Sequence, residues 1–399
     1  MKLIDKDLKN KVLSSMMTII DKKRKDLLQA NKEDLEAFNR DDQALYDRLV
    51  VDDEKVDGMI KAISEVRDQA DPVNREISSS ELDSGLKIIN KTAPFGTIMI
   101  IYESRPDVTI EAAVVAFKAN NKILLKGGKE AYNSNKILVK FWHEALQENG
   151  LEKDWIEMLE LNREETQAFL KNPNQPIDLI VPRGGERLIQ FVKEHASCAV
   201  LVSGRGNNFL YVAEDADWKK TLQVIINAKT DKISGCNALD KVLIDKKIPN
   251  YEAKLKELKE VLTTAKVNVL VDAEVKKTLT SSEEIKDEDT WYEEFLAMKI
   301  VLGAVENIDE AISKINKFSG GHSTVILTEN SEKAGYFMEN IDSAAVYHNA
   351  STRFTDGGQM GVGAELAIST DKLHHRGPLG LKQLVTNKYY VYGDGHVRV

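Results

Sequence analysis

One of the two cysteines in the chain lies in a stretch whose composition favours a functional turn. Residues 227–240 read NAKTDKISGCNALD, and Ser234, Gly235 and Asn237 surround Cys236. These residue types favour a turn in which the backbone comes close to another group. A cysteine thiolate is a nucleophile that forms covalent acyl intermediates. A cysteine outside a disulfide is also among the most buried residue types, so a role as core filler is the alternative.

Three segments pair glycine with a cation in a way that suits an anionic cofactor. They are KGG at 126–128, PRGG at 182–185 and SGRG at 203–206, and each follows an expected strand. At the start of a helix such a turn binds phosphate groups through its backbone amides. None is a GxGxxG motif, since Phe209 stands where the third segment needs glycine. We expect a dinucleotide site, with ordinary strand-to-helix turns as the alternative, built from Lys126, Gly127, Arg183, Gly184, Gly185 and Gly204.

A fourth polar cluster suits a zwitterionic ligand. The stretch HNASTRF offers an amide, two hydroxyls and a guanidinium, which match the charged ends of an amino acid. These groups are those of Asn349, Ser351, Thr352 and Arg353. A polar turn that caps a helix is the alternative interpretation.

The elements that carry these residues alternate in type. Residues 1–70 show helical spacing of leucines, and 85–103 predict two strands broken by Pro94 and Gly96. From 122 to 230, and again from 241 to 327, short apolar strands alternate with amphipathic helices. This alternation predicts an α/β fold of two domains, each a parallel sheet covered by helices. Cys236 falls at the expected seam, where pockets are common.

Composition narrows the function classes. The 399 residues carry a net charge of −9, which argues against nucleic acid as a partner. We see no run of about 18 apolar residues and no apolar signal segment, so we expect no membrane partner. Two cysteines make no disulfide framework, and no metal-ligand spacing is present, so we expect a cytoplasmic protein without a metal.

Several motifs together resemble the aldehyde dehydrogenase superfamily and, within it, the gamma-glutamyl phosphate reductases. They are YESRPDVT at 102–109, LKGGKEAYNSN at 125–135, VPRGG at 181–185, NAKTDKISGCN at 227–237, NASTRFTDGGQ within 346–370 and HRGPLGL at 375–381. The resemblance implies NADPH-dependent reduction of L-glutamyl 5-phosphate to glutamate 5-semialdehyde, the second step of proline biosynthesis, through a thioester on Cys236. Another acyl-transfer aldehyde dehydrogenase, CoA-acylating or succinyl-type, is the alternative.

The resemblance also implies roles for individual residues. Ser104 and Arg105 stand near the place of the superfamily's oxyanion asparagine, and Arg105 could instead bind the substrate phosphate. Lys126 matches the lysine that meets the adenosine ribose or its phosphate, and Glu294 matches the glutamate on the nicotinamide ribose. The glutamate that activates water in hydrolytic relatives is absent, because Val202 or Ser203 takes its place. This absence agrees with a reductase.

The resemblance further implies an aldehyde-dehydrogenase-like architecture. A Rossmann-type NADP(H)-binding domain is expected at 1–228, a catalytic domain at 229–370, and a C-terminal return with an oligomerisation segment at 371–399. Strands near 85–95 are expected to join that segment in a small β-flap of a homo-oligomer. Association with glutamate 5-kinase is a further expectation. The chain departs from the family at Thr324 and at Gly235, which puts local substrate geometry in doubt.

Overall fold

Two separate parallel sheets organise the chain, each in its own compact unit. The computed structural model describes residues 2–39 and 43–398. The first unit takes in residues 1–203, 361–367 and 378–399, and the second takes in 204–360 and 368–377. We describe each unit by itself.

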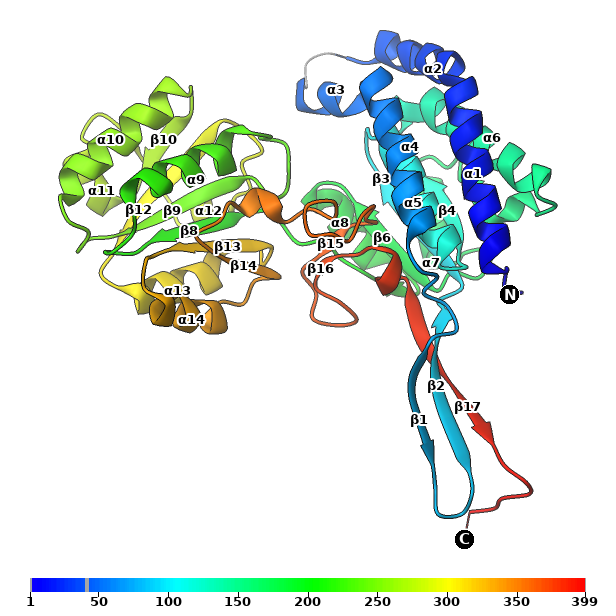
Figure 1. Ribbon diagram of the computed structural model, residues 1–399. Helices are drawn as coiled ribbons and strands as arrows, with labels where there is room; N and C mark the ends of the chain where they lie inside the picture. The colour runs from blue at the N-terminus through cyan, green and yellow to red at the C-terminus, as the bar shows by residue number, and fades with distance from the viewer. Residues whose placement is uncertain (1, 40–42, 399) are drawn as a thin grey trace. The chain divides into compact units, whose positions relative to one another are not determined.

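The first unit begins with four helices (Figure 1). Acidic side chains start two of them, since Asp5 accepts from the amide of Asp7 and Asp52 accepts from that of Lys55. The four helices are α1 (Lys6–Lys22), α2 (Arg24–Ala37), α3 (Gln43–Leu49) and α4 (Asp53–Asp68).

The sheet of the first unit has five parallel strands in the order β5-β4-β3-β6-β7. Its strands are β3 (Thr97–Tyr102), β4 (Lys122–Lys126), β5 (Ile156–Met158), β6 (Leu179–Arg183) and β7 (Ala199–Val200). Alternate side chains of each strand face opposite layers. The covering segments are α5 (Pro106–Lys118), η1 (Lys129–Ala131), α6 (Tyr132–Glu148), η2 (Lys153–Trp155), α7 (Arg163–Lys171) and α8 (Glu186–His195). Ile98 and Ile100 belong to one core cluster with apolar residues of α1, α4, α5 and α6, whereas Met99 and Ile101 belong to another with those of α7 and α8.

A three-stranded antiparallel flap also belongs to the first unit. Strands β1 (Glu76–Glu81), β2 (Lys87–Pro94) and β17 (Val385–Tyr392) lie in the order β1-β2-β17, with Tyr389 opposite Asn90. Figure 1 shows the C-terminal strand beside the two early ones. All of β1 is exposed. The expected strands near 85–95 and the C-terminal strand therefore meet in one sheet.

The second unit holds a seven-stranded sheet in the order β11-β10-β12-β9-β8-β13-β14. All its strand pairs are parallel. The strands are β8 (Asn208–Val212), β9 (Leu239–Asp245), β10 (Asn268–Val271), β11 (Glu283–Glu284), β12 (Lys299–Val305), β13 (Ser323–Leu327) and β14 (Ala345–His348). The helices are α9 (Trp218–Thr230), α10 (Tyr251–Thr264), α11 (Ala273–Thr278), α12 (Asp289–Tyr292), α13 (Ile308–Phe318) and α14 (Ser331–Asn340). Short segments follow at η3 (Thr352–Phe354) and β15 (Ile368–Ser369). The chain then passes into the first unit again within β16 (Gly377–Pro378), before η4 (Leu381–Gln383).

The α/β fold with two parallel sheets is confirmed, but the units divide earlier than we expected. Strand β8 pairs with β9 and β13, so 204–228 belongs to the second unit and not to the cofactor unit expected at 1–228. One expected turn was also wrong. The segment at 203–206 leads into strand β8, so Gly204 does not precede a helix. Its alternation of glycine with Arg205 resembles a strand-to-helix turn, but the next element is a strand that joins the other sheet.

Candidate active site

The carboxyl ends of β3, β4 and β6 carry most of the residues predicted to bind the cofactor. The chain runs from β3 to β4 and β5 on one side, then returns to β6 on the other side of β3. The strand order therefore switches between β3 and β6, which is where open parallel sheets bind ligands. Arg183 ends β6 and Lys126 ends β4, and these two strands lie on either side of β3.

An unpredicted carboxylate lies at this switch point. Oε2 of Glu103 accepts a hydrogen bond from the amide of Gly185 at 3.2 Å, at the start of α8. A Cβ on Gly184 would lie 2.5 Å from the same oxygen. The two glycines therefore have a packing role beside Glu103, whether or not they also touch a cofactor. Glu103 gave no signal in the sequence beyond its place directly after a strand.

The end of β4 presents a cation whose position is held by the backbone. Nζ of Lys126 donates to the carbonyl oxygen of Gly127 at 2.9 Å. Burial lowers the pKa of Lys126, and the carboxylate of Glu130 works in the opposite direction. A Cβ on Gly127 would lie 2.3 Å from Nδ2 of Asn135, so only glycine lets the chain pass here. The arrangement suits a sugar hydroxyl or a phosphate of a nucleotide.

Ser104 and Arg105 form a strained turn directly after β3. Ser104 has a φ of 31°, which is rare outside glycine and often marks a functional site. Its amide and its hydroxyl both donate to Oε1 of Glu130, at 3.0 and 2.7 Å. Nη2 of Arg105 lies 2.6 Å from Oδ2 of Asp107. Burial alone would raise the pKa of Asp107, but the cations of Arg105 and Arg183 outweigh it and lower the value to about 2. Arg105 is thus a well-held cation, and its role stays a prediction.

In the second unit, Cys236 lies in two tight turns that lead into β9. These turns span residues 232–238, which we call the cysteine loop. The amide of Gly235 donates to the carbonyl of Lys232 at 3.1 Å, and that of Ala238 donates to Gly235 at 3.0 Å. The cysteine is exposed and forms no disulfide. The core-filler interpretation is therefore wrong, and the thiol is accessible for chemistry.

The predicted residues Ser351, Thr352 and Arg353 fold back against this loop. Oγ1 of Thr352 donates to the carbonyl of Asn237 at 2.6 Å. Nδ2 of Asn237 donates in return to the carbonyls of Arg353 and Thr355, at 3.2 and 2.9 Å. Ser351 caps the short helix η3 by accepting from the amide of Arg353. The structure thus joins the cysteine loop to a segment 115 residues later in the chain.

The guanidinium of Arg353 lies beside the cysteine loop. Its Nε binds Oδ2 of Asp231 at 3.0 Å, at the end of α9. Its Nη1 would lie 2.8 Å from a Cβ placed on Gly235, the residue before the cysteine. A cation therefore lies beside Gly235, the residue that precedes the cysteine.

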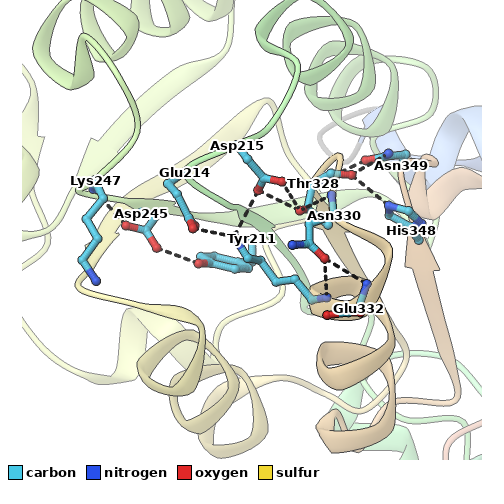
Figure 2. A network of polar contacts seen from close by, with 11 residues as sticks. Tyr211, Glu214, Asp215, Asp245, Lys247, Thr328, Asn330, Glu332, His348 and Asn349 are labelled. Carbon is cyan, nitrogen blue, oxygen red and sulfur yellow. Dashed lines mark hydrogen bonds and ion pairs between the residues drawn. The ribbon is translucent and has the colours of Figure 1, made fainter.

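Asn349 lies elsewhere, in a polar network at the carboxyl ends of β8, β9, β13 and β14 (Figure 2). Its side chain donates to the carbonyl of Thr328 at 2.8 Å and accepts from the amide of Thr328 at 3.1 Å. Oγ1 of Thr328 binds Asp215 at 2.7 Å, and the hydroxyl of Tyr211 binds Asp245 at 2.8 Å. These contacts give Asn349 a structural role, and a substrate contact by this residue stays a prediction.

Glu294 is half-buried in the loop between α12 and β12. Buried charges hold its neighbours, because Nζ of Lys241 donates to the carbonyl of Glu293 at 2.7 Å and Oδ2 of Asp240 accepts from the amide of Phe295 at 3.0 Å. Gly204 packs against Thr370, whose Oγ1 would lie 2.2 Å from a Cβ at that position. A cofactor role for both residues stays a prediction.

A buried polar chain supports the cysteine loop from within and was missed from the sequence. Nδ1 of His322 lies 2.7 Å from Oγ of Ser323, which lies 2.6 Å from Oγ1 of Thr355, and the hydroxyl of Tyr347 is 2.7 Å from the same Oγ1. Burial lowers the pKa of His322 to about 4, so the ring is neutral at pH 7. Polar residues at the start of an apolar strand, HST before VIL, were the available signal.

Within residues 2–39 and 43–398, no helix is long and apolar enough to cross a membrane. In the same ranges, no three His, Cys, Asp or Glu side chains are grouped as a metal ion would require.

Comparisons with known proteins agree on one family. The sequence model of the aldehyde dehydrogenase family matches residues 17–304. The gamma-glutamyl phosphate reductase of Thermotoga maritima is 42% identical over 98% of this chain and 94% of its own, and that of Persephonella marina is 39% identical over 98% and 90%. The crystal structure of the Thermotoga maritima reductase superposes with a TM-score of 0.93 at 42% identity, covering 99% of this chain and 95% of that one. An acetylating aldehyde dehydrogenase of Geobacillus thermoglucosidasius, 17% identical, shares the fold with a TM-score of 0.70 over 99% of this chain and 94% of that one. The chain belongs to the aldehyde dehydrogenase family, whose members are NAD(P)-dependent enzymes, and within it to the gamma-glutamyl phosphate reductases.

Proposed function

We propose that the chain reduces L-glutamyl 5-phosphate to L-glutamate 5-semialdehyde with NADPH, through a thioester on Cys236. This is the second step of proline biosynthesis from glutamate. One observation carries the proposal. An exposed cysteine lies in a turn anchored to the segment 351–355, in a chain 42% identical over almost its whole length to reductases named for this substrate.

Cys236 forms the covalent bond. Its thiolate attacks the γ-acyl carbon, and phosphate leaves with the electron pair of the broken C–O bond. NADPH, when bound, supplies the hydride that reduces the resulting thioester, and the thiolate then leaves to give the aldehyde. Splitting the reaction in this way replaces one difficult step by two easier ones. A free thiol has a pKa of about 8.5, and the guanidinium of Arg353 lies beside Gly235, the residue that precedes the cysteine.

We assign substrate recognition to two cations, Arg353 and Arg105, each of which is held by a carboxylate of its own unit. Arg353, held by Asp231, suits the α-carboxylate of the substrate. Arg105, held by Asp107, suits the phosphate, which a planar guanidinium binds through two parallel hydrogen bonds. We assign Ser351 and Thr352 to the shape of the pocket rather than to direct contact, because both are buried and Thr352 already donates to Asn237.

The residues at the ends of β4 and β6 fit a nicotinamide dinucleotide. Lys126 presents a cation whose pKa burial lowers, and it suits the 2′-phosphate that distinguishes NADPH from NADH. Gly127 keeps the turn after β4 narrow, since any side chain there would meet Asn135. Arg183 adds a second cation at the end of β6. Glu294 is assigned to the nicotinamide ribose on the family resemblance.

The flap is assigned to assembly. Strand β1 is exposed along its whole length and offers an unpaired edge, as a strand that pairs with a second copy would. We therefore propose a homo-oligomer, which sedimentation of the full chain tests directly. Association with glutamate 5-kinase stays a prediction.

The reverse reaction tests the function, because the acyl phosphate decays quickly. Pyrroline-5-carboxylate and NADP are mixed with the protein, with and without inorganic phosphate, while the absorbance of the reduced cofactor is followed. We expect turnover only with phosphate and none in Cys236→Ser. Cys198→Ser is the matched control and keeps its activity, because Cys198 lies beside the short strand β7 of the other unit.

Other results would redirect the assignment. Turnover without phosphate would mean that water hydrolyses the thioester. Turnover that needs coenzyme A in place of phosphate would move the chain to the acylating dehydrogenases. Activity that survives in Cys236→Ser would overturn the thioester.

A further inference from the structure

The side chain of Asn208 anchors the backbone of the cysteine loop by hydrogen bonds. Asn208 is the first residue of β8, and its side chain is fully buried. Its Nδ2 donates to the carbonyl oxygens of Cys236 and Ala238, both at 2.7 Å, and to that of Gly206 at 2.9 Å. Its Oδ1 accepts from the amide of Ser323 at 3.0 Å. One side chain therefore ties the loop to the starts of two strands.

The contact with Cys236 holds the backbone from which the thiol projects. A hydrogen bond to the carbonyl of Cys236 sets the orientation of the peptide plane that follows its Cα. The backbone of Gly206 lies against the same carbonyl, since a Cβ on Gly206 would be 2.0 Å from that oxygen. The residue is thus held from two sides. Misplacing a reacting atom by about 1 Å can cost about 100-fold in rate.

Only an amide of this size satisfies the site. Three carbonyl oxygens converge on the Nδ2 group, and an alanine would leave them without this donor in a buried place. An ionised aspartate would set a carboxylate oxygen against them. A protonated aspartic acid has the same shape and can donate one hydrogen bond, so it would restore part of the contact.

The neighbouring Asn207 provides a matched comparison. It is also buried, and its Nδ2 donates to the carbonyls of Trp291 and Phe318 at 2.6 and 2.9 Å. The two asparagines share residue type and burial, but of the two only Asn208 is bonded to the carbonyl of Cys236.

We infer that Asn208 is a positioning residue for Cys236, which it orients through the hydrogen bond from its side-chain amide to the cysteine carbonyl. The inference rests on the proposed function for its kinetic part, and on the loop geometry alone for its structural part.

The test compares Asn208→Ala, Asn208→Asp and Asn207→Ala in the full chain. Hydrogen exchange needs no substrate, and we expect exchange in the peptide covering 232–240 to rise about tenfold in Asn208→Ala only. In the reverse reaction we expect kcat to fall about 100-fold in Asn208→Ala while KM stays within about threefold. Asn207→Ala keeps kcat within about threefold of the parent.

Asn208→Asp separates positioning from simple destabilisation. Its kcat relative to the parent should fall as the pH rises from 6 to 9, because the carboxyl loses its proton and with it the donor. The corresponding ratio for Asn208→Ala should stay low and constant. Equal losses of kcat in the Asn207 and Asn208 variants would overturn the inference, as would an unchanged kcat in Asn208→Ala.

The two proposals fail in different ways. A parent protein without reductase activity, whose 232–240 peptide is still loosened in Asn208→Ala alone, would remove the proposed function and leave the anchoring of the loop in place. Full reductase activity of the parent protein, with unchanged exchange of the 232–240 peptide in Asn208→Ala, would remove the anchoring of the loop and leave the proposed function in place.

Discussion

The neutral ring of His322 makes the second unit sensitive to acid. The ring is fully buried next to Ser323, and burial lowers its pKa from 6.5 to about 4. In the unfolded chain the ring takes up a proton at about 6.5. Between these values the unfolded state binds more protons than the folded state, so the free energy of unfolding falls as the pH falls. Above pH 6.5 the ring is neutral in both states and contributes no pH dependence.

The size of the effect follows from the two pKa values. Their difference, at about 1.4 kcal/mol for each pH unit, amounts to about 3 kcal/mol over the whole range. About 2 kcal/mol of this is lost by pH 5. His322→Gln removes the titrating ring. Between pH 7.5 and pH 5, the free energy of unfolding should therefore fall by about 2 kcal/mol more in the parent than in the variant. His374→Gln is the control, since that ring is exposed.

Two measurements check this prediction. Urea unfolding followed by tryptophan fluorescence gives the free energies at each pH. Carbon-13 labelling of the histidines lets NMR follow the protonation of the His322 ring directly. The His322 signal is identified by its loss in the variant. We expect that signal to stay unchanged from pH 7.5 down to 5.5. A signal that titrates near pH 6.5 would refute the argument, because it would mean that burial does not suppress the charge.

Two further predictions concern the surroundings of the loop. Gly206→Ala should lower kcat at least tenfold in the reverse assay, because the new Cβ would lie 2.0 Å from the carbonyl oxygen of Cys236; an unchanged kcat would contradict the close approach. In the parent, the free energy of unfolding should rise between pH 7 and 9, and Lys241→Met should remove this rise. Burial lowers the pKa of Lys241 to about 7, so above that value the unfolded chain binds one proton more than the folded one. Urea unfolding at both pH values checks this, and a variant whose stability still rises as in the parent would count against it.

Much of the fold could be predicted from the sequence because its signals are local. Strand and helix alternate with the periods expected of half-buried elements, and glycine closes the turns between them. The division at 203–204 could not be found in this way. The segment 208–212 is as apolar as the strands before it, and only its pairing with 239–245 and 323–327 places it in the second sheet.

The candidate site was predictable only where residue type indicates chemistry. Cys236 and Arg353 carry reactive or charged groups, and the guanidinium of Arg353 lies beside Gly235, the residue before Cys236. Asn208, Asn237 and Thr355 were missed because their contribution is a hydrogen bond to a backbone carbonyl or a neighbouring hydroxyl far along the chain. Such a bond depends on tertiary contacts that no short sequence pattern records.

The predicted residues lie at opposite edges of the two sheets. In the first unit the predicted cofactor residues follow strands, at the carboxyl edge where parallel sheets bind ligands. In the second unit the same edge is filled by polar groups that bind each other, as Asn349 binds Thr328 and Tyr211 binds Asp245 (Figure 2). Cys236 instead precedes β9, so it lies at the amino edge. The first residues of the strands lie at this amino edge. Asn208, the first residue of β8, therefore holds the loop there through the backbone carbonyls of Cys236 and Ala238 and not through the thiol.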